Sequence, residues 1–171
     1  MSDRVLIFGG SGMLGHKLGQ IMSKRLETHV TLRDRALAER YPQIFRATSV
    51  IDGVDVLDAE TVVRAFSIAK PTVVINAVGV VKQLDSSKNA ITSISINSLF
   101  PHKLAELCAK KGARLITIST DCVFSGERGN YAETDRPDPE DMYGQSKLLG
   151  EVQTGNCLTI RTSIIGRQIQ G

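Results

Sequence analysis

A tyrosine and a lysine stand four residues apart in the segment Tyr143-Gly144-Gln145-Ser146-Lys147. Side chains at this spacing lie on one face of a helix, one turn apart. A cation beside a phenol favours the phenolate, so we expect Lys147 to lower the pKa of Tyr143. The segment Ser119-Thr120-Asp121 follows an apolar run and places a further hydroxyl, that of Thr120, at a strand end. Together these groups could move a proton to or from the oxygen of a carbonyl or an alcohol. An isolated pair of this kind is more often a solvated helix face, so the interpretation depends on context.

A glycine-rich turn directly follows the apolar run at residues 5–8 and supplies that context. In such turns the first glycine, here Gly9, permits the tight bend, and the second, Gly12, lets the backbone approach a pyrophosphate. The third, Gly15, lets the next helix pack close to the strand. The helix N-terminus offers N–H groups to an anion, and Ser11 could hydrogen-bond a phosphate. The turn therefore predicts a dinucleotide site, with a plain tight connection as the alternative.

Apolar strand-like runs alternate with helical stretches along the 171 residues, a length that suits one domain. We expect strands at residues 5–8, 29–32, 50–56 (interrupted near residues 52–53), 73–75, 115–118 and 157–160, and helices at residues 14–26, 36–39, 59–69, 93–111 and 141–152. Strands separated by helices imply right-handed crossovers and a parallel sheet. The predicted fold is a single α/β, Rossmann-like domain over residues 1–171, a doubly wound parallel sheet of about six strands with helices on both faces.

The second strand ends in Arg33-Asp34-Arg35, at the position whose side chains distinguish NADPH from NADH. An arginine there favours the 2′-phosphate of NADPH, and an acidic residue favours the 2′-hydroxyl of NADH. Because Arg33 comes first, NADPH is slightly preferred over NADH. A solvated turn remains the alternative for this segment.

Two further strand ends are candidates for cofactor contacts. Asp55 and Val56 could meet the exocyclic amine and the ring face of the adenine, although Asp58 nearby competes as a helix N-cap. The segment Asn76-Ala77-Val78-Gly79 leaves little bulk where the ribose and the phosphates must pass.

Composition excludes several other classes of protein. The net charge is +3, basic residues are scattered and aromatic residues make up 5%, which does not suit a nucleic-acid partner. No apolar stretch approaches the roughly 20 residues needed to cross a membrane, and the start lacks a signal-peptide core. We expect reduced thiols, a cytoplasmic location and no metal site, because the cysteines and histidines have no ligand-like spacing: Cys108, Cys122, Cys157, His16, His29 and His102.

With these residues in view, the chain resembles the extended short-chain dehydrogenase/reductases, and within them the dTDP-4-dehydrorhamnose reductase group. The resemblance rests on Gly9-Gly10-Ser11-Gly12-Met13-Leu14-Gly15, Asn97-Ser98-Leu99-Phe100-Pro101, Ser119-Thr120-Asp121-Cys122-Val123-Phe124-Ser125-Gly126, Tyr143-Gly144-Gln145-Ser146-Lys147-Leu148-Leu149-Gly150-Glu151 and Arg161-Thr162-Ser163. It spans nearly the whole chain.

The resemblance implies a role for each matching residue. Tyr143 would give a proton to the C4 oxygen of the substrate, and Lys147 would lower the pKa of the phenol and hold the nicotinamide ribose. Thr120 would hydrogen-bond the same oxygen, Asp121 would organise the site, and Asn97 would shape it. The remaining cofactor contacts would come from Met13, Leu14, Ser119, Thr162 and Ser163, the last two near the nicotinamide.

The implied activity is NAD(P)H-dependent reduction of the C4 ketone of a nucleotide-linked 4-dehydro-6-deoxy sugar, for surface polysaccharide. The partners would be the nucleotide sugar and a second copy of the chain, in a homodimer. Two departures qualify this expectation. Cys122 stands where the group commonly has an aromatic residue, and family members are about twice as long as one such domain. We therefore expect the cofactor-binding part of a longer reductase, lacking most of the C-terminal substrate domain and nearly inactive alone. The alternatives are a dinucleotide-binding regulatory subunit and a nucleotide-sugar epimerase or dehydratase.

Overall fold

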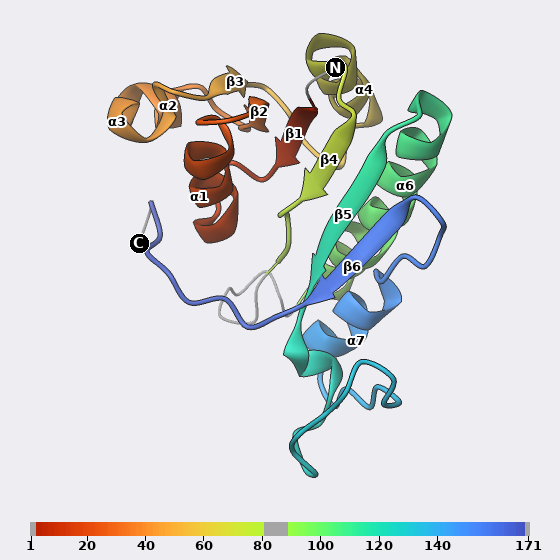
Figure 1. The fold of residues 1–171 in the computed structure, drawn as a ribbon. Coiled ribbons are helices and arrows are strands. Elements are labelled where there is room, and N and C mark those ends of the chain that lie inside the picture. Colours follow the sequence, from red (N-terminus) through yellow and green to blue (C-terminus); the bar gives the residue numbers. More distant parts are fainter. Residues whose placement is uncertain (1–2, 81–88, 170–171) are drawn as a thin grey trace.

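The computed structural model describes residues 3–80 and 89–169, and these form one parallel sheet with helices packed on it (Figure 1). The sheet order is β3-β2-β1-β4-β5-β6, and every neighbouring pair is parallel. The strands are β1 (Arg4–Phe8), β2 (Glu27–Thr31), β3 (Ser49–Ile51), β4 (Val73–Asn76), β5 (Arg114–Ser119) and β6 (Cys157–Arg161). This order places a topological switch point between β1 and β4, where ligands bind in open parallel sheets. The predicted fold class is confirmed.

Helices cover both faces of the sheet. They are α1 (Met13–Met22), α2 (Ala36–Arg40), α3 (Pro42–Phe45), α4 (Ala59–Ala69), α5 (Ala90–Ser93), the π-helical segment η2 (Ile94–Leu99), α6 (Phe100–Lys111), the 3₁₀ turn η3 (Asp121–Val123) and α7 (Met142–Leu149). Residues of α1, α2 and α3 pack in one apolar cluster, whereas α4 and α6 pack in the other. Within the described residues, no helix is long and apolar enough to cross a membrane.

Strand β1 shows why the sheet needs helices on both sides. Leu6 and Phe8 belong to the cluster under α4 and α6, whereas Val5 and Ile7 belong to the cluster under α1. All four side chains are at most 2% exposed. Successive side chains of a strand point to opposite faces, so a continuous apolar run buries both faces at once.

The third strand is shorter than predicted, because it ends at Ile51 rather than near residue 56. Gly53 has a φ of 62°, in the left-handed region, and this turns the chain out of the extended conformation. The guanidinium of Arg64 then donates to the carbonyl oxygens of Asp52 and Gly53, at 2.7 and 2.8 Å. The turn is thereby fixed onto α4.

The prediction of one long helix at residues 93–111 is also wrong, because this segment is divided into α5, η2 and α6. Pro101 has no N–H to donate to the carbonyl of Asn97, and its ring crowds that carbonyl. The N–H of Phe100 instead reaches back to Ser95, which widens the helix into a π turn. The predicted stop at Gly112 is confirmed, since Gly112 has a left-handed φ of 69°.

Three other helix boundaries differ from the prediction. The helix α1 ends at Met22 rather than at residue 26. Pro42 ends α2, as expected, but it also begins α3, which the prediction did not include. Proline suits the first position of a helix because its missing N–H would have no helical partner there. The helix α7 stops at Leu149 rather than at residue 152, and a Cβ added to Gly150 would lie 1.8 Å from the carbonyl oxygen of Asn97.

Candidate active site

The turn between β1 and α1 approaches its surroundings so closely that side chains do not fit. Gly9 has a φ of 89°, and a Cβ placed on Gly15 would lie 2.0 Å from the carbonyl oxygen of Gly9. At Gly12 the nearest atom to an added Cβ is 3.4 Å away, an ordinary contact. Gly9 and Gly15 are therefore required by the turn itself, and Gly12 is not.

The N-terminus of α1 has no side-chain cap. Gly12 is the N-cap residue, no side chain of the described residues accepts from the N–H groups of the first turn, and that turn contains no acidic residue. In contrast, Asp58 caps α4 and Asp141 caps α7. Unpaired N–H groups at a helix N-terminus attract an anion such as a pyrophosphate. The geometry thus fits the predicted dinucleotide.

A cleft of about 560 Å³ lies at the carboxyl ends of β1, β4 and β5, and it brings most of the predicted residues together. Figure 1 shows how the chain after β6 runs back across these strand ends toward α1. The lining comprises Gly12, Met13, Leu14, Ala77, Val78, Gly79, Ile118, Ser119, Thr120, Asp121, Cys122, Tyr143, Lys147, Thr162, Ser163, Ile164 and Gln168. The candidate catalytic residues and the second glycine of the turn therefore share one space.

Lys147 is buried at the base of this cleft, where it is 9% exposed. Its ammonium donates to the carbonyl oxygen of Ile118, at 2.5 Å. Burial lowers the pKa of Lys147 to about 8, and the carboxylate of Glu151 acts against this shift. The lysine is therefore still mostly protonated at neutral pH, and its charge is available at the site.

Tyr143 differs from the expectation in the direction of its pKa. The pKa of the hydroxyl is raised by burial, although hydrogen bonding with Thr120 partly opposes this. The prediction that Lys147 lowers the pKa of Tyr143 is wrong for this structure, because the ammonium is directed at the carbonyl of Ile118. A raised pKa keeps the phenol protonated at neutral pH, which is the state that a proton donor needs.

Thr120 and Asp121 occupy the end of β5 beside the phenol. Thr120 donates to the carboxylate of Asp121 at 3.1 Å and accepts from the N–H of Cys122 at 3.2 Å. The hydroxyl of Ser163 also donates to the carboxylate of Asp121. This bond from Ser163 is the main reason why the pKa of Asp121 is lowered. Asp121 thus stays charged and fixes the segment after β6 to the strand end.

Sequence reasoning missed the role of Glu151, which follows α7. Its carboxylate accepts from the hydroxyl of Ser119 at 2.7 Å and from the guanidinium of Arg161 at 2.8 and 2.7 Å. Its side chain is 5% exposed. The spacing of four residues from Lys147 could have indicated the pair, since such residues are neighbours on a helix.

Asn97 shapes the site from behind rather than lining it. Its side chain accepts from the N–H of Val80 at 2.9 Å and donates to the carbonyl of Val80 and to the hydroxyl of Ser146, both at 3.1 Å. It therefore joins the chain after β4 to the helix that carries Tyr143 and Lys147. Asn76 has a similar local role, because its side chain accepts from the N–H of Val78 at 3.1 Å.

Arg33 and Ser11 lie apart from the cleft, in a separate cavity of about 200 Å³ beyond β2. Asp34 also lines this cavity, but its carboxylate accepts from the N–H of Ala36 at 2.9 Å. Arg35 forms surface ion pairs elsewhere. Arg33 is thus the arginine of this segment that faces the cavity, in agreement with a phosphate contact.

Asp55 and Val56 line neither space. The carboxylate of Asp55 accepts from the N–H of Leu57 at 2.9 Å, and Val56 packs on the apolar core. Asp58 is the N-cap of α4, through the N–H of Glu60 at 2.9 Å, as the competing interpretation held. Adenine contacts from Asp55 and Val56 stay a prediction.

Comparison with known proteins places this site in a family. Residues 3–168 match the family described as "RmlD substrate binding domain". The chain belongs to this family. It is 32% identical over 155 residues to a dTDP-4-dehydrorhamnose reductase of Mycobacterium tuberculosis, covering 88% of this chain and 45% of the relative. It is 30% identical over 152 residues to the methionine adenosyltransferase 2 subunit beta of Rattus norvegicus, covering 88% of this chain and 42% of the relative.

A solved structure gives the same result for the fold. The dTDP-4-dehydrorhamnose reductase of Bacillus anthracis, in complex with NADP, superposes with a TM-score of 0.70 at 25% identity. The match covers 94% of this chain and 53% of that one. The chain thus spans about half the length of these relatives.

Proposed function

We propose that this chain is the cofactor-binding and proton-transferring part of an NAD(P)H-dependent reductase. The substrate would be the C4 ketone of a nucleotide-linked 4-dehydro-6-deoxy sugar, of the kind used in surface polysaccharide. The observation that carries the proposal is the single cleft in which Tyr143, Lys147 and Thr120 meet the uncapped N-terminus of α1. The names of the relatives support the same activity.

The dinucleotide would supply the hydride, and the residues of this chain would bind the cofactor and supply the proton. The Gly12 N–H donates to the carbonyl of Gly9 at 3.0 Å, so the backbone N–H groups of Met13 and Leu14 would hold the pyrophosphate, and Lys147 would hold a ribose hydroxyl. Tyr143 would donate to the ketone oxygen and transfer its proton as that oxygen gains charge. The hydroxyl of Thr120, which donates to Asp121 in this structure, would turn to donate to the same oxygen.

Arg33 would favour NADPH over NADH, because it faces the cavity beyond β2 where a 2′-phosphate can bind. In support, the relative from Bacillus anthracis was solved with NADP. Arg33→Ala is expected to weaken the binding of NADPH more than that of NADH. Equal losses would remove the phosphate role of Arg33.

Calorimetric titration of the chain with NADPH and NADH tests the cofactor site. Gly12→Val is the decisive variant, because the added Cβ meets only ordinary contacts in the folded chain, whereas the branched side chain would enter the space of the pyrophosphate. Gly155→Val is the matched control, since nothing lies within 4 Å of an added Cβ there. A folded Gly12→Val chain with unchanged affinity would overturn the assignment.

A second candidate function is a dinucleotide-binding regulatory subunit without turnover, which the named subunit from Rattus norvegicus favours. The two differ in what the phenol does. A subunit needs the cofactor cleft but no proton donor, so replacing Tyr143 would leave its function intact. The oligomeric state and the cellular location stay predictions.

A further inference from the structure

Glu151 occupies a junction that the proposed reaction does not use. It joins two neighbouring strand ends, because Ser119 closes β5, Arg161 closes β6, and these two residues are register partners in the sheet. Both side chains donate to the same carboxylate. A buried carboxylate with this many donors is held in one orientation. The last residues of β5 and β6 are thereby fixed relative to each other.

The side chain of Arg161 also contacts the loop of residues 124–138. Its guanidinium lies 5.2 Å from the centre of the Phe124 ring, and Phe124 stacks on Tyr131 at 4.4 Å between centroids and 12° between planes. The guanidinium of Arg128 lies over the ring of Tyr131, 5.0 Å from its centre. Four planar groups therefore stack in sequence, with an ion pair at each end, to Glu151 and to Asp135.

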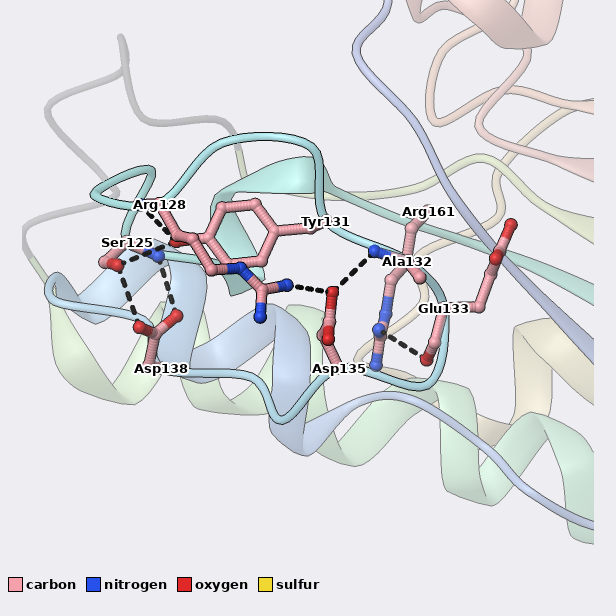
Figure 2. Close-up of polar contacts among 8 residues, drawn as sticks. All are labelled: Ser125, Arg128, Tyr131, Ala132, Glu133, Asp135, Asp138 and Arg161. Atoms are coloured by element: carbon pink, nitrogen blue, oxygen red, sulfur yellow. Dashed lines mark hydrogen bonds and ion pairs between the residues drawn. The ribbon is translucent and has the colours of Figure 1, made fainter.

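Figure 2 shows that further bonds stiffen the same loop. Asp138 accepts from the N–H and the hydroxyl of Ser125, both at 2.8 Å. Asp135 also accepts from the N–H of Ala132 at 2.6 Å. The loop forms one wall of a groove of about 920 Å³ that shares Asp121 and Cys122 with the cleft. Its position therefore affects the edge of the site.

Glu151 is also connected to Lys147 through β5. The ammonium of Lys147 donates to the carbonyl of Ile118, and the next residue, Ser119, donates to the carboxylate of Glu151. The titratable groups that line the cleft together with this lysine are Tyr143 on its own helix and Asp121 and Cys122 of η3. Glu151 and its ion partner Arg161 lie beyond Ser119, in the neighbouring groove. Among them, Glu151 is the group whose charge raises the pKa of Lys147 against the effect of burial.

We propose that Glu151 is a positioning residue that couples Lys147 to the loop of residues 124–138. Its carboxylate is the counter-charge of the Lys147 ammonium, and through Arg161 it anchors the stacked loop at the edge of the cleft. The consequence for catalysis rests on the proposed function, whereas the coupling itself does not.

NMR titration of the lysine Cε signals measures the coupling directly, with the Lys147 signal assigned by its loss in Lys147→Arg. Glu151→Gln removes the charge and keeps the shape, so the pKa of Lys147 is expected to fall below about 8. Arg161→Met removes the opposite charge, so the same pKa should hold or rise. Glu106→Gln, at an exposed position on α6, is the control that should change nothing. A role limited to packing would disturb Lys147 equally in the first two variants, and that result would overturn the proposal.

Glu151→Gln leaves Arg161 without its ion partner, and an orphaned buried charge can prevent folding. The double variant Glu151→Gln/Arg161→Met removes both charges and keeps the experiment possible. The pKa of Lys147 is again expected to fall, and an unchanged value would contradict the proposal.

Amide hydrogen exchange tests the second half of the coupling. In Arg161→Met and in Glu151→Gln, residues 124–138 should exchange several-fold faster, while α4 stays as protected as before. Unchanged protection of the loop would overturn its anchoring by Arg161. Calorimetry with NADPH separates this inference from the proposed function: a lowered pKa of Lys147 in a chain that binds no dinucleotide would support the coupling and overturn the reductase.

Discussion

The glycine turn between β1 and α1 and the polar cluster after β5 and α7 line one cleft, but different forces hold them. At the turn, Gly15 contacts the backbone of Gly9 directly, and no side chain caps the helix. At the cluster, side-chain hydrogen bonds and ion pairs link Ser119, Glu151 and Arg161 around the buried Lys147.

This difference determines which substitutions disrupt each region. The turn has no room for a side chain at Gly15, so an added methyl group would clash with the backbone of Gly9. The cluster is held by particular polar groups, so removing one of them would break a hydrogen bond or an ion pair. Substitutions that separate folding from function should therefore be additions at Gly12 and deletions at Tyr143.

The largest effect is expected for Tyr143→Phe, which deletes one hydroxyl and keeps the ring. General acid catalysis contributes about 10²–10⁴-fold, so single-turnover hydride transfer should slow by that factor, about 3–5 kcal/mol in activation free energy. The measurement needs a protein that carries this chain together with a complete sugar pocket. The affinity for NADPH should barely change. A near-full rate would favour the regulatory subunit.

Gly15→Ala tests the opposite region by addition. The new Cβ would lie 2.0 Å from the carbonyl oxygen of Gly9, so the backbone must shift. Overpacking of this kind costs about 3 kcal/mol, near the upper end of its usual range. Denaturant unfolding measures the loss, and Gly155→Ala, in open space, is the control. Equal stability of the two variants would show that α1 can move away from the turn.

The turn could be read from the sequence because its causes are local. Gly9 and Gly15 after an apolar run specify a backbone that approaches itself, and the structure has a left-handed φ at Gly9. The sheet was equally readable, because apolar runs of the right length leave few topologies when both faces must be buried.

The cluster could not be read in the same way, because its contacts join distant segments. Glu151 meets Ser119 across 32 positions in the sequence, and Asn97 meets Ser146 across 49. The predicted direction of the pKa shift of Tyr143 was wrong for the same reason. Helical spacing placed Lys147 near the phenol, but the ammonium instead reaches the carbonyl of Ile118, 29 positions earlier in the chain.

Lys147→Met measures how much the buried ammonium of Lys147 destabilises the folded chain. The pKa of this lysine falls from 10.5 to about 8 on folding, so its buried ammonium destabilises the chain by on the order of 3 kcal/mol below pH 8. Loss of the bond to Ile118 offsets about 1 kcal/mol of that. We expect the variant to be about 2 kcal/mol more stable at pH 7 and to bind NADPH more weakly.

The pH dependence identifies the cause of this gain. Between pH 8 and 10.5 the unfolded lysine binds more protons than the folded one, so the parent chain recovers stability as the pH rises. Urea unfolding at pH 7 and near pH 10 should therefore show the advantage of Lys147→Met shrinking. The raised pKa values of Tyr143 and Cys108 are common to both chains and cancel. An advantage that is constant with pH would mean that packing, not charge, is the cause.

The smallest effect on stability is expected at the N-cap of α4, a feature that α1 lacks. Asp58 accepts from the N–H of Glu60 at 2.9 Å, so Asp58→Ala should cost about 1 kcal/mol, or 2–4 °C in Tm. Because α4 lies outside the cleft, the loss in Tm should be the same with and without saturating NADPH. Asp34→Ala is the informative contrast, since Asp34 lines the cavity of Arg33, and its effect should change when NADPH is bound. If NADPH cancelled the loss at Asp58 instead, the dinucleotide would reach α4, and α1 would no longer be the helix whose N-terminus is kept for the phosphates.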